Sequence, residues 1–143
     1  MFCNATILFV PGMALASLIL LRHRKINNIY TGGIIMIFGV LKDIKEGENR
    51  VMCTPVEVAS IIGSGHTVLT QKDCGKASGF PDEAYKKVGA EIVESAEEMY
   101  IRCEMIVKVK EFEESEFELI RENQIILGCI HPASNPKEVD AIL

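Results

Sequence analysis

Short apolar runs alternate with amphipathic segments from residue 34 to the end of the chain. Four runs have the composition of buried strands and are bounded by polar turns, at residues 34–40, 67–70, 105–109 and 124–130. Helix-start residues or helical spacing predict helices that begin near residues 55, 82, 95, 112 and 136. Strands alternating with helices predict a parallel sheet with helices on its faces, an α/β fold.

Local signals mark where several of these helices begin and end. Thr54 is expected to cap the first helix, which ends at Gly63. Asp82 is expected to cap a short helix that Gly89 ends, and Ser95 opens the next one. These signals place loops after the predicted strands.

Ligands of parallel α/β sheets bind outside the carboxyl ends of the strands. Three such ends carry a residue with useful chemistry: Arg50, Lys110 and His131. A guanidinium can hold a carboxylate with two parallel hydrogen bonds, an ammonium can polarise a carbonyl, and a histidine can exchange a proton near neutral pH. The alternatives remain a solvated surface arginine, a solvated lysine on an edge strand and a histidine bonded to nearby backbone.

Lys108 and Lys110 lie two apart in a strand pattern, so their side chains point to one face. Because buried strands seldom admit two lysines, the strand is expected to emerge into solvent there. Five glutamates between residues 111 and 118 predict a solvated helix face, and a metal site in this run is the weaker interpretation. Phe112 is expected to point inward from the same helix.

Residues 1–35 differ from the rest of the chain in charge, because they hold three basic residues and no acidic one. The whole chain carries −5, so residues 36–143 carry −8. An uncharged run at residues 5–21 lies at the short limit for a membrane span. Three interpretations remain: a membrane anchor, a buried helix, or a segment upstream of a true start at Met36. We treat residues 1–35 as an extension that packs little against the domain at 36–143.

Composition narrows the function classes. The net charge of −5 argues against nucleic-acid binding. Five cysteines form no CxxC pair, and an odd number favours reduced thiols and a cytoplasmic setting over a disulfide framework. No Cys/His cluster has zinc-ligand spacing, so no metal is expected. No G-x-G-x-x-G dinucleotide motif occurs in the chain.

Several segments match one known family in order and without large gaps. The segments are residues 36–51 (MIFGVLKDIKEGENRV), 79–85 (GFPDEAY), 88–93 (VGAEIV) and 106–111 (IVKVKE), followed by His131. They resemble the N-terminal substrate domain of the alanine dehydrogenase and pyridine nucleotide transhydrogenase family, closest to alanine dehydrogenase. The resemblance implies a Rossmann-like parallel sheet with flanking helices, forming the incomplete N-terminal part of a two-domain enzyme.

The resemblance also implies residue roles. In alanine dehydrogenases the matching arginine binds the carboxylate of pyruvate or L-alanine, the matching lysine holds the oxo or amino end, and the matching histidine is the acid/base. These roles fall to Arg50, Lys110 and His131. Leu41 and Phe112 stand where the family usually has proline, and we expect both changes to loosen loops beside the site.

The resemblance further implies an NAD-dependent enzyme whose cofactor is held by a domain absent from this chain, with a homo-oligomer for the full-length protein. The chain alone is then expected to be inactive. Two alternatives remain: the N-terminal domain of a transhydrogenase alpha subunit, and a non-catalytic α/β module. Lys110 and His131 favour a dehydrogenase, because transhydrogenases typically lack them, whereas residues 132–136 (PASNP) resemble the transhydrogenase sequence.

Overall fold

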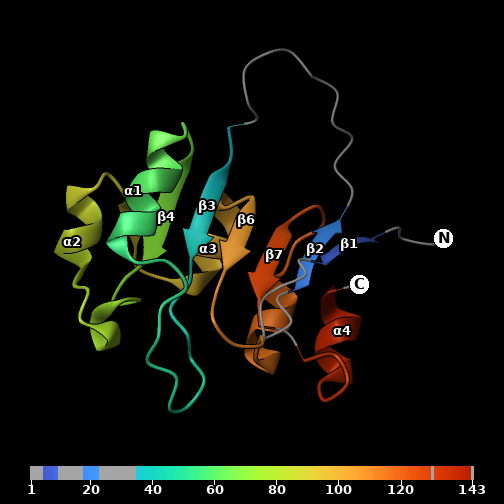
Figure 1. The fold of residues 1–143 in the computed structure, drawn as a ribbon. Helices are drawn as coiled ribbons and strands as arrows, with labels where there is room; N and C mark the ends of the chain where they lie inside the picture. The colour runs from blue at the N-terminus through green and yellow to red at the C-terminus, as the bar shows by residue number, and fades with distance from the viewer. Residues whose placement is uncertain (1–4, 10–17, 23–34, 130, 143) are drawn as a thin grey trace.

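The computed structural model describes residues 5–9, 18–22, 35–129 and 131–142, the first two stretches as backbone. The strands are β1 (Ala5–Phe9), β2 (Leu18–Arg22), β3 (Ile37–Val40), β4 (Thr67–Gln71), β5 (Glu91–Val93), β6 (Met105–Val107) and β7 (Ile125–Gly128). The α-helices are α1 (Pro55–Gly63), α2 (Asp82–Lys87), α3 (Ala96–Arg102) and α4 (Pro136–Ile142), and the 3-10 helices are η1 (Lys76–Ser78) and η2 (Glu114–Leu119). All strands join one sheet in the order β1-β2-β7-β6-β3-β4-β5 (Figure 1).

Five neighbouring strands, β7-β6-β3-β4-β5, run parallel, which confirms the predicted α/β class and its Rossmann-like sheet. Four of them coincide with the predicted apolar runs. The pattern does not predict β5, because this strand has three residues and its first, Glu91, is exposed. Strand β5 pairs with β4, which lies about 20 residues earlier in the chain, and the local sequence of β5 does not encode this pairing.

The N-terminal stretches differ from every helical interpretation of residues 5–21. Within the described part, β1 and β2 pair antiparallel, and β2 pairs antiparallel with β7 from Leu18–Gly128 to Leu21–Ile125. The expectation that residues 1–35 pack little against the domain is therefore wrong at β2. The outer edge of β7 offers unpaired N–H and C=O groups, and an extended apolar segment satisfies them. The rest of residues 1–34 lies outside the described residues, and the proposed start at Met36 stays a prediction.

No helix among the described residues is long and apolar enough to cross a membrane.

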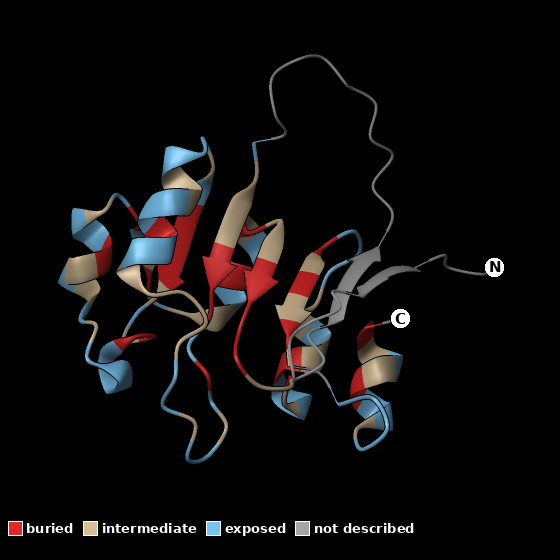
Figure 2. Cartoon of the chain, viewed as in Figure 1, coloured by how far each residue is buried: buried red, intermediate tan, exposed pale blue. Residues whose placement is uncertain are grey.

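Helices cover both faces of the parallel sheet, and the buried residues concentrate on the strands between them (Figure 2). On one face α1 and α2 pack through Val58 and Tyr85. On the other face α3 packs through Met99 and Tyr100, together with η2. Helix α3 approaches β3 closely, since a Cβ on Gly39 would lie 2.6 Å from Cys103 Sγ. This close approach requires glycine at position 39.

Helix starts follow the local signals with two corrections. Thr54 caps α1 through a capping box, and Ser95 caps α3, both as predicted. Asp82 is not the cap of α2: Pro81 is, and the Asp82 carboxylate instead accepts the Asp73 N–H at 2.9 Å. The helix expected at residues 112–122 is the shorter 3-10 helix η2, because Glu113 before it is extended and acts as its cap.

Candidate functional site

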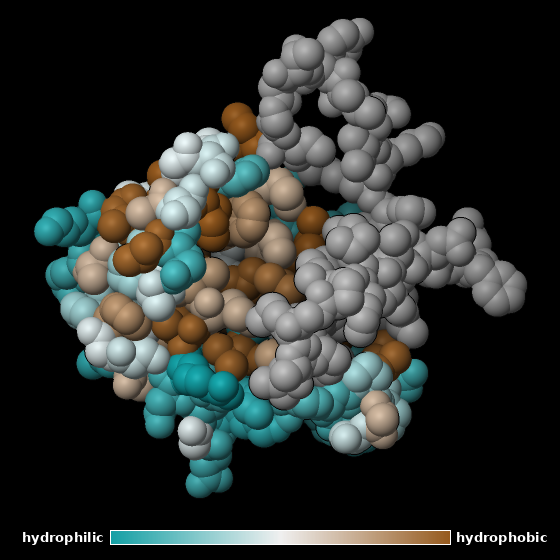
Figure 3. Space-filling model, in the orientation of Figure 1, coloured by the Kyte–Doolittle hydropathy of each residue, from teal (hydrophilic) through white to brown (hydrophobic). Residues whose placement is uncertain are grey.

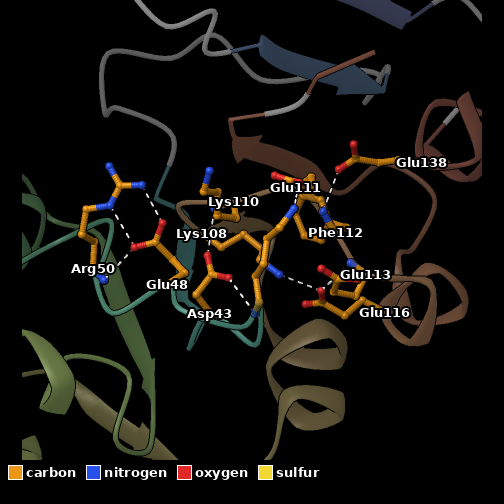
Figure 4. A network of polar contacts seen from close by, with 11 residues as sticks. Asp43, Glu48, Arg50, Lys108, Lys110, Glu111, Phe112, Glu113, Glu116 and Glu138 are labelled. Carbon is orange, nitrogen blue, oxygen red and sulfur yellow. Dashed lines mark hydrogen bonds and ion pairs between the residues drawn. The ribbon is translucent and has the colours of Figure 1, made fainter. Parts of the chain in front are cut away.

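The loops that follow β3 and β6 are tied together at the carboxyl edge of the sheet. Asp43, buried after β3, accepts the Lys110 N–H at 2.8 Å through one carboxylate oxygen and the Lys45 N–H at 3.2 Å through the other. Figure 4 shows this carboxylate between the two loops. The sequence pattern does not reveal Asp43, because its partner is 67 residues away. This contact sets where Lys110 leaves the strand.

Arg50 is held by a carboxylate two residues before it. Its Nε–H donates to Glu48 Oε1 at 2.8 Å, and its Nη2 donates to Glu48 Oε2 at 2.5 Å. The Arg50 N–H adds a third bond at 2.9 Å. The Arg50 side chain is 65% exposed and that of Glu48 only 6%. The arginine is therefore at the surface, as one alternative held, but in a defined position.

Electrostatics at this pair follow from its geometry. The side-chain hydrogen bonds from Arg50 lower the pKa of Glu48 to about 2 against the opposing effect of burial, and the charge of Lys110 acts in the same direction. In return, the hydrogen bonds to Glu48 raise the pKa of Arg50. Glu48 is thus ionised at neutral pH, and Figure 4 shows it hydrogen-bonded to Arg50.

The end of β7 reaches the same edge. Cys129, directly after β7, is close enough to act on the pKa of Arg50. His131 itself is exposed, and its carbonyl accepts the N–H groups of Ser134 at 2.9 Å and Asn135 at 3.1 Å in the turn before α4. The structure therefore places Arg50 and Lys110 in neighbouring loops, with the charge of Lys110 acting on the Arg50 partner Glu48, whereas His131 occupies the turn between β7 and α4.

His131 acts on a buried carboxyl of α4. Burial raises the pKa of Glu138, while its hydrogen bond from the Phe112 N–H and the charges of Lys108 and His131 act against that rise. Glu138 is 1% exposed, and its Oε1 accepts the Phe112 N–H at 2.7 Å. Glu138 therefore connects the loop after Lys110 with the helix after His131.

Lys108 does not emerge into solvent, so that expectation is wrong. It is fully buried, its Nζ donates to Glu116 Oε2 at 2.6 Å, and it lies 5.0 Å from the centre of the Phe112 ring. Glu116 also accepts the Tyr100 hydroxyl at 3.2 Å and the Glu113 N–H at 2.9 Å. The interpretation of the acidic run as a solvated face is therefore wrong at Glu116. A buried lysine is tolerated because this carboxylate compensates its charge.

Neither departure from the family pattern loosens its loop. The Leu41 N–H donates to the Val107 carbonyl at 3.0 Å, and the Phe112 N–H donates to Glu138. Proline could make neither bond, since it has no N–H. Both side chains are also buried, Leu41 at 2% and Phe112, as predicted, at 3% exposure.

Other reactive groups are less suited to chemistry. Burial raises the pKa of Cys53 and Cys103 to about 11 and that of Cys74 to about 12, which leaves these thiols protonated at neutral pH. No group of three or more His, Cys, Asp or Glu residues with metal-binding geometry occurs in the described part of the chain. A cavity of about 390 Å³ lies between η2 and the start of α4, with Lys45, Phe117 and Lys137 among its lining residues.

A parallel sheet with basic side chains at its carboxyl edge is the architecture of α/β domains that bind small molecules there. Residues 39–143 match the family described as "Alanine dehydrogenase/PNT, N-terminal domain". The chain belongs to this family.

Relatives and solved structures agree with this assignment. The chain is 44% identical over 108 residues to an alanine dehydrogenase of Methanococcus maripaludis, covering 76% of this chain and 29% of that protein. It is 41% identical over 105 residues to alanine dehydrogenase 1 of Staphylococcus aureus, covering 73% and 28%. A solved L-alanine dehydrogenase superposes with a TM-score of 0.72 at 36% identity, covering 75% of this chain and 29% of that one.

A transhydrogenase from Sinorhizobium meliloti shares the fold, with a TM-score of 0.69 at 24% identity, covering 74% of this chain and 31% of that one. The chain thus spans less than a third of the length of the proteins that it matches.

Proposed function

We propose that this chain supplies the substrate-binding part of an NAD-dependent alanine dehydrogenase, which interconverts L-alanine with pyruvate and ammonia. One observation carries the proposal: at the carboxyl edge of the parallel sheet Arg50 is hydrogen-bonded to Glu48, and Lys110 leaves β6 in a neighbouring loop that Asp43 ties to the one carrying Arg50, close enough for its charge to act on Glu48. A guanidinium can bind a substrate carboxylate through two parallel hydrogen bonds, and an ammonium at the same edge of the sheet can hydrogen-bond its oxo or amino end.

Each residue has a distinct part in the proposed site. Arg50 binds the substrate carboxylate through N–H groups that Glu48 leaves free. Lys110 holds and polarises the oxo group of pyruvate, or hydrogen-bonds the amino group of alanine. His131, exposed before α4, exchanges a proton with the substrate. Together these three residues bind and orient the substrate and exchange a proton with it.

NAD, when bound, accepts the hydride from the substrate. No residue of this chain is assigned to hold it, in line with the lack of a glycine-rich dinucleotide motif. The chain by itself is therefore expected to give no alanine-dependent NADH formation, because an acceptor free in solution forfeits the advantage of proximity.

Pyruvate titration followed by NMR tests the proposal without depending on the cofactor. We expect saturable binding that shifts backbone signals near Arg50 and Lys110. Arg50→Lys should weaken it about tenfold or more, since an ammonium cannot make two parallel hydrogen bonds. Arg102→Lys is the matched control, because Arg102 also pairs with carboxylates but lies on α3.

The outcome separates the candidate functions. Absent binding, or equal weakening by both arginine variants, would remove the substrate-site assignment. Saturable binding of a nicotinamide nucleotide without any binding of pyruvate would support the transhydrogenase alternative instead.

A further inference from the structure

Beyond the three proposed site residues, we propose that Glu48 is a positioning residue: it fixes the Arg50 guanidinium so that the outer edge of this group faces an incoming substrate carboxylate. The inference rests on the proposed function, in which Arg50 binds that carboxylate. It assigns a role to a residue that touches Arg50 and not the substrate.

The hydrogen bonds leave a defined set of donors free. A guanidinium has five N–H groups in a fixed plane. Glu48 takes one from Nε and one from Nη2, along the inner side of Arg50. Two parallel N–H groups, one on Nη1 and one on Nη2, remain on the outer edge, and this is the arrangement that binds a carboxylate in two places. The Arg50 side chain is 65% exposed, so a ligand can reach it from solvent.

Glu48 has a largely buried side chain. Its side chain is 6% exposed, and it accepts the Arg50 N–H as well as the two side-chain bonds. Gly47, with φ of +79°, makes the turn that precedes it. Glu48 and Arg50 are two apart in this loop, so one short segment carries both partners. A long arginine side chain held in this way has less freedom to lose when a ligand binds.

The negative charge of Glu48 would by itself repel an anionic substrate. The positive charge of Lys110 acts on the Glu48 carboxylate and offsets this repulsion. Figure 4 shows the ammonium of Lys110 and the free end of Arg50 on the same side of Glu48. Glu48 therefore orients one cation while the second keeps the site attractive to an anion.

The test measures pyruvate affinity and the Arg50 Nε–H signal by NMR in the unaltered chain and in Glu48→Ala, Glu48→Gln and Glu94→Ala. Glu48→Ala should weaken pyruvate binding roughly tenfold, the lower limit for loss of an orienting partner at metal sites, and should broaden or shift the Nε–H signal. Glu48→Gln keeps one acceptor oxygen and should restore part of both. Glu94→Ala removes the carboxylate of the exposed Lys72–Glu94 pair and should change neither.

Each result supports or overturns the role of Glu48. Unchanged or tighter pyruvate binding in Glu48→Ala, with Arg50→Lys still weakening it, overturns the role of Glu48 and leaves the proposed function in place. Absent binding by the unaltered chain, or no effect of Arg50→Lys, overturns the proposed function and this inference together. If Glu48→Ala does not fold, Glu48→Gln decides alone: an Arg50 signal and an affinity equal to those of the unaltered chain overturn the inference.

Discussion

Replacing Lys108 with methionine removes the buried ammonium while keeping an unbranched apolar stem in the same space. Lys108 is fully buried, and its partner Glu116 has a side chain only 5% exposed. The variant leaves a buried carboxylate without its counter-charge. Removing one partner of a buried pair typically costs about 3–5 kcal/mol. Because the Tyr100 hydroxyl and the Glu113 N–H still donate to Glu116, we expect a loss near the lower limit, about 3 kcal/mol.

Urea unfolding at neutral pH measures this loss, and a thermal scan should show a decrease in Tm of about 10 °C for a domain of this size. Lys72→Met is the matched control, because the Lys72–Glu94 pair has nearly the same N–O distance, 2.7 Å, but both side chains are at least 49% exposed. An exposed pair contributes about 0–1 kcal/mol. The comparison therefore isolates the effect of burial.

A second variant checks the cause. Lys108→Met combined with Glu116→Gln removes both charges and keeps an acceptor for Tyr100, so it should recover most of the lost stability. The reasoning is refuted if Lys108→Met costs no more than Lys72→Met, or if the double variant is as unstable as the single one.

Two further predictions concern packing and pH. Gly39→Ala places a Cβ 2.6 Å from Cys103 Sγ and should lower the free energy of unfolding by about 1–3 kcal/mol. Gly63→Ala has open space around it in α1 and should raise the free energy of unfolding by about 0.5–1 kcal/mol in the same urea assay. Equal effects of the two variants would contradict the close approach of α3 to β3. Burial raises the pKa of Glu138 above that of the unfolded chain, so this carboxyl contributes stability in acid that is lost as pH rises through the folded pKa. Glu138→Gln keeps an acceptor for the Phe112 N–H, so its Tm relative to the unaltered chain should improve from about pH 4 to about pH 8, and a constant difference would count against a raised pKa.

Hydrophilic and apolar residues are unevenly placed on the face of the molecule shown in Figure 3. In the view of Figure 3, hydrophilic residues gather around the lower edge of the domain, at the end of the sheet where the loops after β3 and β6 lie in Figure 1. The apolar residues visible on this face lie higher, over the sheet and α1. The Arg50 side chain is 65% exposed, so effects of Arg50→Lys on binding are easier to separate from effects on folding.

Much of the parallel sheet is determined by the sequence itself, because its signals are local. The apolar runs coincide with β3, β4, β6 and β7 since a strand buried on both faces must be apolar throughout. Thr54 and Ser95 are visible as caps because their hydrogen bonds reach only a few residues along the chain. Parallel strands also bring their carboxyl ends to one edge, so the loops that carry Arg50 and Lys110 are expected at the same edge of the sheet.

Tertiary structure alone decided the features that depend on distant partners. The sequence of β2 is compatible with a helix or a strand, and its hydrogen bonds with the open edge of β7 make it a strand. Lys108 is buried and not solvated, because Glu116 turns inward from η2 and compensates its charge. Phe112 could replace a proline without loosening its loop, because Glu138 accepts its N–H from a helix 26 residues further along. In each case the free energy of a polar group depends on whether a partner meets it in space, and no local pattern records that meeting.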